Sequence, residues 1–407
     1  MGSRRKRPPL TAAVRGSRVV QPRLYILVSC SAAPSGRRLP RAVSVVRVST
    51  VDPLADARWD AFVSTRPDAV VYHHSAWLAA LEREYGTRPV GLACEDAHAR
   101  FVGVLPLLRT RGLPLLDAAL LGTRLASLPR TPVAGPLAVD RPATAALVGG
   151  AVDLARGEPG SCLQIKASSG DLNEAPAGLT RVAWRPSYAV ALPNDVKEIR
   201  FGNARNHGAV RRAVNKAAKA GVRVRVAETE AQLRAWYGLY LETMRWHAIP
   251  PRPFRFFVAL WELLRPKGLM RLLVAELDGS PPRMLAGSIL LMFGGTVFYA
   301  FNGRRREDLS LRPNDAIHWR AIHDACSEGF RRYDFGEVPV GNEGLAQFKR
   351  KWATETATLY RYYYPPPRAD QNGRRVPAQA AQLGKAIWRR TPLAATALVG
   401  DALWRYG

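Results

Sequence analysis

The chain has 407 residues, of which 47% are hydrophobic, and its formal net charge is +27 at pH 7. Because domains commonly contain about 100 to 200 residues, this length predicts two domains. The longest apolar stretch, from Met284 to Phe301, is interrupted by Gly294 and Gly295. We interpret it as a β-hairpin, which excludes a membrane-spanning helix there.

The positive charge indicates a polyanionic partner, such as nucleic acid, a diphosphate-bearing metabolite or an anionic membrane surface. A composition rich in Arg and Ala is also what a GC-rich genome would produce. Residues 1–50 contain no Asp or Glu, and the sequence beyond Pro365 is basic as well. We therefore expect residues 1–45 to be a basic, disordered extension outside the folded body.

The four cysteines lie far apart, at Cys30, Cys94, Cys162 and Cys326, and no Cys-x-x-Cys pair occurs. This spacing supports neither a disulfide framework nor a zinc site, and it fits a reducing cytoplasm. His318 and His323 are five residues apart on an expected helix and so do not share a face. We expect packing or surface roles for them and no metal site.

In residues 46–192 the patterns predict a strand near Val46, followed by helices and strands in alternation. Ser75 is a plausible N-cap and Gly86 a plausible C-terminal stop for one helix. The expected helices are Ala55–Ser64, Ser75–Tyr85 and Ala143–Ala155, and the strands lie near Arg88–Asp96, Arg100–Thr110, Cys162–Ser168 and Arg181–Leu192.

Residues 193–365 show a second, fuller α/β series. The expected helices are Ala204–Ala220, Glu230–Trp246, Phe254–Leu264, Pro313–Glu328 and Leu345–Trp352, with strands between them and a turn at Gly294-Gly295. The elements follow in the order helix, strand, helices, three antiparallel strands, helix, strand, helix and strand. This order is that of the GNAT acyltransferase fold, and the first half resembles a shortened copy. The predicted fold class is therefore α/β (α+β), with two GNAT-like domains in tandem, each a mixed, mostly antiparallel sheet flanked by helices.

Residues 366–407 are predicted to be a Pro-rich linker followed by a basic amphipathic helical tail. Leu383, Ile387 and Trp388 are interleaved there with Lys385 and Arg389. Two interpretations are open for this tail. It packs back on the domain, or it lies on an anionic membrane surface.

The expected helix Ala204–Ala220 carries Arg and Lys without any acidic residue between Glu198 and Glu228. Solvated helix faces usually mix both signs of charge, so a one-signed face indicates phosphate or nucleic-acid contact. Arginine also suits bidentate phosphate recognition.

The segment from Phe298 to Trp319 holds further candidates for substrate binding, namely Asn302, Arg304, Asn314 and Asp315. A loop before a helix N-terminus can hold a diphosphate through free N–H groups and the helix dipole. This loop lacks the Gln/Arg-x-x-Gly-x-Gly/Ala pattern that does so in GNAT domains. The alternative is that Asn314 and Asp315 cap the helix.

The stretch from Tyr333 to Trp352 combines a strand end, a Gly-containing loop and the start of a helix. A carboxylate there, Asp334 or Glu337, is suited to accept a proton from an attacking amine or hydroxyl. Lys349, next to Phe348, could stabilise an oxyanion or phosphate. The alternative is a structural Asp334–Lys349 ion pair with Phe348 in the core.

Three blocks together resemble the FemAB-like and CelD-like acyltransferases of the GNAT superfamily, which include peptidoglycan-bridge aminoacyltransferases and exopolysaccharide-associated relatives. They are "NARNHGAVRRAVNKAAKAGVRV", "LRPNDAIHWRAIHDACSEGFRRYDFGEV" and "GLAQFKRKWATETATLYRYYYP". The resemblance implies that Phe348 and Lys349 contribute to the site and that Lys349 stabilises developing negative charge. It further implies that Arg205, Arg211 and Arg212 meet a diphosphate. The chain departs from the family where many relatives read Asp-Phe-Gly-Arg-Ser, because Glu337 and Val338 stand in place of Arg-Ser.

The hypothesis is a cytoplasmic acyltransferase (EC 2.3), and a peripheral location at the inner face of the cytoplasmic membrane is left open. It transfers an acyl or aminoacyl group to an amine or hydroxyl of a cell-envelope or exopolysaccharide glycan precursor. Acyl-CoA or aminoacyl-tRNA is the expected donor co-substrate, with no tightly bound cofactor, no metal and no DNA. One alternative is a non-catalytic GNAT-fold protein that binds anionic polymer or membrane. The other is an aminoacyl-tRNA-dependent peptidoglycan-bridge aminoacyltransferase.

Overall fold

The computed structural model describes residues 23–29, 42–111, 123–158, 160–168, 172, 178–367 and 378–404. The first half of the chain contains β1 Arg23–Ser29, β2 Ala42–Val51, α1 Arg58–Thr65, η1 Val71–His73, α2 Ser75–Tyr85, β3 Val90–Glu95, β4 Phe101–Arg111, β5 Thr123–Ala126, β6 Leu137–Ala138, α3 Arg141–Arg156, β7 Cys162–Ala167 and β8 Thr180–Ala191.

The second half contains η3 Val196–Glu198, α4 Ala204–Lys219, β9 Val222–Val226, α5 Glu230–His247, α6 Phe254–Leu263, η4 Arg265–Lys267, β10 Met270–Leu277, β11 Arg283–Phe293, β12 Thr296–Arg304, η5 Leu309–Leu311, α7 Pro313–Ser327, β13 Arg332–Glu337, α8 Glu343–Trp352, β14 Glu355–Tyr364, α9 Ala378–Arg390 and α10 Leu393–Leu403. The predicted helices are therefore present, with ends shifted by up to three residues.

Two details of the sequence analysis are corrected by the structure. The N-cap of α2 is His74, whose side chain accepts a hydrogen bond from the Ala76 N–H, while Ser75 is already helical and donates to Asp60. Gly86 ends this helix as predicted, with a φ of +64°. The expected disordered extension also contributes a strand, because β1 pairs with β2 over seven residue pairs from Arg23↔Val48 to Ser29↔Ala42. The remainder of residues 1–41 lies outside the described residues.

The two halves repeat one order of elements. Each has a strand, two helices, an antiparallel run of strands, a helix and then a strand parallel to one strand of that run. The parallel pairs are β5 with β7 and β12 with β13. The tandem, mostly antiparallel α/β fold predicted from the sequence is confirmed.

The strands of the two halves form one sheet by exchanging their last strands. The order is β1-β2-β3-β4-β5-β7-β14-β8-β13-β12-β11-β10-β9, with β6 paired to β4. β8 ends the first half in sequence yet pairs with β13 of the second half, and β14 pairs with β7 of the first half. The predicted boundary near Pro193 therefore separates two halves that share a sheet.

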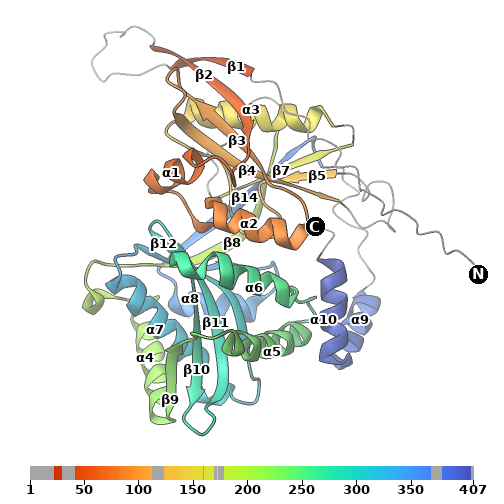
Figure 1. Cartoon of the computed structure of the whole chain (residues 1–407). Coiled ribbons are helices and arrows are strands. Elements are labelled where there is room, and N and C mark those ends of the chain that lie inside the picture. The colour runs from red at the N-terminus through yellow and green to blue at the C-terminus, as the bar shows by residue number, and fades with distance from the viewer. Residues whose placement is uncertain are drawn as a thin grey trace, which may run out of the picture.

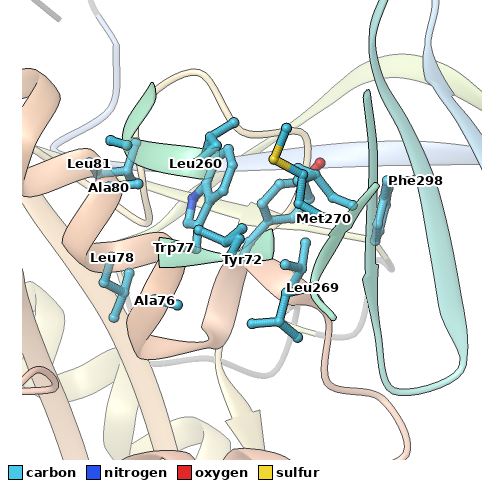
Figure 2. Close-up of a cluster of buried hydrophobic side chains, with 14 of the residues drawn as sticks. Tyr72, Ala76, Trp77, Leu78, Ala80, Leu81, Leu260, Leu269, Met270 and Phe298 are labelled. Atoms are coloured by element: carbon cyan, nitrogen blue, oxygen red, sulfur yellow. The ribbon is translucent and has the colours of Figure 1, made fainter. Parts of the chain in front are cut away.

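Alternation along β10 sends its side chains into two different cores. Leu272 and Val274 lie in the core beneath α5 and α6, whereas Leu273 and Ala275 lie in the core beneath α4 and α7. The first of these cores also contains residues of α2, and Figure 2 shows Tyr72, Trp77 and Leu260 gathered there with Phe298. Because one core draws on both halves, their relative placement is set by buried apolar contacts as well as by the shared sheet.

The C-terminal helices α9 and α10 lie beside α5 (Figure 1). Trp404 is buried, and its Nε1 donates to the Pro250 carbonyl at 3.1 Å, while Asp401 pairs with Arg255. α9 is mostly exposed. The tail thus packs back on the domain mainly through α10, while α9 contributes the hydrogen bond from Arg389 Nε to the Trp246 carbonyl. None of the helices in the described residues is long and apolar enough to cross a bilayer.

Candidate active site

The candidate site begins where β12 and β13 part. These parallel strands pair only over Thr296–Phe298 and Arg332–Asp334. Just beyond, Gly336 has a φ of +75°, a conformation that glycine adopts without strain, and the register of β13 with β8 shifts. Asp334 Oδ1 accepts from the Gly336 N–H at 2.6 Å and from Ser187 Oγ at 3.3 Å. The carboxylate of Asp334 therefore holds this bulge.

Lys349 projects from α8 into the same strand end. Its side chain is 5% exposed, and Nζ donates to the carbonyl oxygens of Phe335, Gly336 and Glu337 at 2.5, 3.0 and 2.9 Å. Burial lowers the pKa of Lys349 to about 8, while Asp334 and Glu337 act in the opposite direction. The three hydrogens of the ammonium group are thus matched by three carbonyls, and no Asp334–Lys349 ion pair occurs among the described contacts.

Glu337 lies at the end of β13 and is bound from both exchanged strands. Its carboxylate accepts from Trp184 Nε1 at 3.0 Å and from Arg185 Nη1 at 2.8 Å, both on β8, and Arg361 Nη2 of β14 lies at 3.4 Å. Two arginines therefore surround the carboxylate of Glu337. The anion found by the sequence analysis is offset by charges from other strands.

Phe348 and Lys349 are adjacent in sequence but face different surroundings. Phe348 contacts the His318 ring, at a centroid distance of 5.6 Å, and lines a cavity of about 550 Å³ between α4 and α8. Asn206 and Lys351 line this cavity too. The expected Phe–Lys pair is present, but only Phe348 reaches the cavity.

Asn302 and Asn314, both predicted to bind substrate, are brought together. Asn302 Nδ2 donates to Asn314 Oδ1 at 3.3 Å and to Ser288 Oγ at 3.1 Å. Asp315 is buried and pairs with Lys351 of α8. The alternative that Asn314 and Asp315 cap α7 is wrong, because the N-cap is Arg312, with a φ of +61° and no capping side-chain hydrogen bond.

Arg304 lies apart from these residues, at the end of β12 beside α5. Its backbone N–H donates to Thr243 Oγ1 at 3.0 Å, and its charge contributes to lowering the pKa of His247. Partial desolvation of that imidazole by the surrounding protein is the larger cause of the shift. The backbone of Arg304 is therefore held by α5.

His318 is a packing residue, as expected. It is buried among Tyr299, Phe335 and Trp352, and its Nδ1 lies 3.0 Å from Tyr333 Oη. Burial lowers its pKa to about 3, and Lys351 and Lys349 add to this shift. The ring is therefore neutral near neutral pH. Aromatic side chains fill the α7 side of the point where β12 and β13 diverge.

The basic helix predicted at 204–220 is α4, and its cations are exposed. They are Arg205, Arg211, Arg212, Lys216 and Lys219. Among the residues that the structure describes, no ion pair or side-chain hydrogen bond joins any of these five to an acidic group. Within the described residues, this face of α4 therefore keeps its positive charge uncompensated.

Several residues of this region escaped the sequence analysis. Trp184, Arg185 and Arg361 bind Glu337, and Lys351 binds Asp315. Lys166 is fully buried on β7 and donates to the carbonyls of Leu128 and Thr131. One signal was available for Lys166, because a lysine inside the apolar strand "CLQIKA" must find internal partners.

Comparison with protein families identifies the class. Residues 204–350 match the family described as the acetyltransferase (GNAT) domain. The match spans α4 to α8 and includes β12, β13 and Lys349. The chain therefore has the GNAT fold, and the matched part of its second half is similar to this domain. Comparison with the curated proteins gave no match.

Solved structures extend the similarity in fold to most of the chain. The fold is similar to that of FemX, with a TM-score of 0.59, 18% identity and coverage of 74% of this chain and 94% of FemX. It is also similar to the C-terminal domain of an Agrobacterium fabrum protein assigned as a lysylphosphatidylglycerol synthetase, with a TM-score of 0.50, 13% identity and coverage of 81% and 94%. The resemblance to FemAB-like relatives of the GNAT superfamily is thus confirmed at the level of the fold.

Proposed function

We propose that this protein is an acyltransferase that modifies an amine or hydroxyl of a cell-envelope or exopolysaccharide glycan precursor. The observation that carries the proposal is the convergence of Asp334, Glu337 and buried Lys349 at the end of β13, inside the GNAT domain. A cation and two carboxylates at this strand end supply the charges that acyl transfer requires.

In the proposed reaction the acceptor's nitrogen or oxygen attacks the acyl carbonyl carbon. A C–N or C–O bond forms, the bond from that carbon to the donor's sulfur or oxygen breaks, and the leaving group takes up a proton. We favour Asp334 over Glu337 as the group that receives the acceptor's proton. Glu337 is surrounded by Trp184, Arg185 and Arg361. Among the polar contacts of the described residues, Asp334 Oδ2 pairs with Arg332 Nε alone, at 3.5 Å.

Lys349 contributes by its charge, because its hydrogens are directed at three carbonyls in this structure. A positive charge in a site with little water acts over a longer distance than the same charge in bulk solvent. A developing oxyanion could also replace one of these carbonyls as the hydrogen-bond acceptor. Both roles require the ammonium form, which dominates below the pKa of about 8.

The donor is either acyl-CoA or aminoacyl-tRNA. No glycine lies between Gly303 and Pro313, so the loop before α7 offers no glycine-rich cradle for a diphosphate. The uncompensated cations of α4 suit a polyanion such as tRNA. These two observations favour the alternative of an aminoacyl-tRNA-dependent transferase.

Membrane contact through the tail fits an acceptor that is linked to lipid. Leu383 and Ile387 of α9 are 64% and 60% exposed, and they lie one turn apart beside Lys385, Arg389 and Arg390. Leu398 of α10 is 72% exposed. The Agrobacterium relative's name also denotes synthesis of an aminoacylated phospholipid.

Transfer assays test the proposal. Purified protein is given radiolabelled acetyl-CoA or radiolabelled aminoacyl-tRNA with an amino-sugar-containing, lipid-linked glycan precursor. We expect consumption of one donor, and RNase sensitivity of labelling identifies tRNA. Lys349→Met should lower turnover at least 100-fold, while Arg320→Ala, which removes an exposed partner of Asp324 on α7, should not.

A different outcome would select the non-catalytic alternative. If Lys349→Met left turnover at the wild-type rate, the strand end would not be the site. If neither donor were consumed, while removal of residues 378–404 abolished binding to anionic polymer or vesicles, the protein would be a binder that has kept the fold without the reaction.

A further inference from the structure

A second cavity, of about 560 Å³, lies on the other side of α4 from the cavity beside Phe348. Its walls come from η3, the loop before α4, α4 itself and α7, which packs against α4 (Figure 1). His207 and Arg211 of α4 line it, whereas Asn206 and Ala209 face the other cavity. The reacting strand end and Lys349 do not contribute to this cavity.

The charge of the lining has one sign. Lys197, Arg200 and Arg211 line the cavity, and no Asp or Glu does. Arg200 uses Nη1 to bind the carbonyls of Lys197 and Ile199, which fixes its side chain at the rim. Nearby arginines also help lower the pKa of His207, although burial is the larger cause. An anion placed among these groups would relieve their mutual repulsion.

The other lining groups are flat rings. Phe201 stacks on His207, with 5.6 Å between ring centroids and 19° between planes, and contacts Trp319 at 5.7 Å. Trp319 in turn packs against His323 at 4.2 Å. A ring system of this kind can hold a planar group by stacking, and arginine can stack on such a group as well.

Each of the two histidines holds a ring nitrogen that makes no hydrogen bond within the described part of the chain. His207 Nδ1 is buried and has no hydrogen-bond partner within the described part of the chain. His323 Nδ1 lies 2.8 Å from the Trp319 carbonyl. Because a carbonyl can only accept, Nδ1 carries the hydrogen and Nε2 of His323 is left as an acceptor.

From this lining we propose that the cavity binds a phosphate-bearing nucleotide. The phosphates lie among Lys197, Arg200 and Arg211, and the base packs against Trp319. The volume is in the range of small-ligand pockets, roughly 300 to 1,000 Å³. The nucleotide is either free or part of an RNA strand that continues along the cations of α4. Nucleotide binding at this site does not depend on acyl transfer.

Calorimetry with the full-length protein tests the proposal with four probes: ADP, UDP, adenosine and inorganic pyrophosphate. We expect ADP or UDP to bind at least tenfold more tightly than pyrophosphate, which lacks a ring, and than adenosine, which lacks phosphate. Equal binding of pyrophosphate and both nucleotides would overturn the proposal, as would the absence of binding by both nucleotides.

Arg211→Gln and Arg212→Gln form a matched pair of variants on one exposed helix. Only Arg211 lines the cavity, so we expect Arg211→Gln to weaken nucleotide binding at least tenfold and Arg212→Gln to leave it unchanged. Equal losses in both variants would show diffuse attraction to α4 and overturn the proposed site. Trp319→Leu tests stacking, and circular dichroism checks that this variant folds.

A single-stranded RNA oligonucleotide separates the two sources of the nucleotide. If the natural ligand is RNA, the oligonucleotide competes with ADP. The affinity of the protein for the oligonucleotide then falls in both the Arg211→Gln and Arg212→Gln variants. If the ligand is a free nucleotide, the oligonucleotide does not displace ADP. Either result supports nucleotide binding in the cavity. The proposal would be refuted if a protein that combines Arg211→Gln, Arg200→Gln and Trp319→Leu still bound ADP as tightly as the wild type.

Discussion

Lys349 keeps a positive charge where little water reaches it, and backbone carbonyls take the place of that water. Removing the side chain would leave the carbonyls of Phe335, Gly336 and Glu337 without their donor. Each unsatisfied buried group costs about 1 to 3 kcal/mol. Lys349 therefore supports the shape of the strand end as well as its charge.

The pKa of Lys349 predicts a pH dependence of stability. On folding it falls from 10.5 to about 8, so between these values the unfolded chain binds a proton that the folded chain has lost. The free energy of unfolding should therefore rise with pH across this window, while below pH 8 the full penalty of the buried charge is present. The rise is roughly 3 kcal/mol, at about 1.36 kcal/mol per pKa unit.

Urea unfolding of the wild type and Lys349→Met, on both sides of pH 8, measures this contribution. The difference between the two proteins cancels other titrating groups, Lys166 among them. We expect the variant to lack most of the rise. If the free energy of unfolding rose with pH equally in both proteins, the contribution of Lys349 would be contradicted.

Glu84 and Arg252 give a second prediction at the scale of single residues. They form an ion pair of 2.7 Å with side chains 0% and 3% exposed, and Arg252 also packs on Phe256 and Trp404. Glu84→Gln would leave a buried guanidinium without its counter-charge and should lower the free energy of unfolding by about 3 to 5 kcal/mol. The double variant Glu84→Gln/Arg252→Met should regain part of this loss. If Glu84→Gln were as stable as the wild type in urea unfolding, the ion pair would be dispensable for stability.

At the scale of elements, the cations of α4 predict how binding to RNA depends on salt. Arg205 and Arg212 are exposed and belong to its uncompensated face. If both contact phosphates, Arg205→Gln/Arg212→Gln should reduce the slope of log affinity against log salt by about 0.7 per contact for single-stranded RNA. Fluorescence anisotropy with a labelled oligonucleotide measures the slope.

The control for this prediction is Arg320→Gln on the neighbouring α7. Arg320 is also exposed, but it pairs with Asp324 within its own helix. Its loss should leave the slope unchanged. If the slope stayed unchanged in Arg205→Gln/Arg212→Gln, these two arginines of α4 would not contact the phosphates of RNA.

Elements defined by local pattern could be predicted from the sequence. α2 spans Ser75–Tyr85 as predicted and ends at Gly86, and β11 turns into β12 at Gly294-Gly295. Apolar periodicity and glycine conformations are properties of neighbouring residues, so the sequence displays them directly. The same holds for the basic face of α4.

The partners within the site could not be predicted in this way. Glu337 is bound by Trp184 and Arg185, about 150 residues earlier in the chain, because strand exchange places β8 beside β13. Lys349 binds backbone carbonyls, which are identical in every residue type and leave no sequence signal. The conformation of Arg312, which displaced the expected caps of α7, likewise depends on its tertiary setting.

At the scale of the whole molecule, exposed apolar side chains gather near the C-terminal helices. They are Leu383, Ile387 and Leu398 of the tail and Trp246 at the end of α5, whose ring contacts the guanidinium groups of Arg306 and Arg389. Apolar groups among cations suit the surface of an anionic bilayer, because each charge can meet a headgroup while the aliphatic side chains enter the interface.

Sedimentation with vesicles of phosphatidylglycerol and phosphatidylcholine tests this surface. We expect Leu383→Gln/Ile387→Gln to lower vesicle binding at least tenfold, because burying one such side chain contributes about 1.5 to 3 kcal/mol. Val340→Gln is the control, since Val340 is 88% exposed but lies in the loop before α8. Equal binding by wild type and the α9 variant would place the membrane contact elsewhere.

The exchange of β8 and β14 also bears on how the chain emerges from the ribosome. One edge of β7 stays unpaired until β14 is translated, almost 200 residues later. β8 likewise leaves the ribosome well before its neighbour β13. The first half therefore exposes unpaired strand edges during synthesis, and such edges favour association between chains. We expect that the native sheet closes only after residue 364 has cleared the exit tunnel, so that both halves reach their final form together.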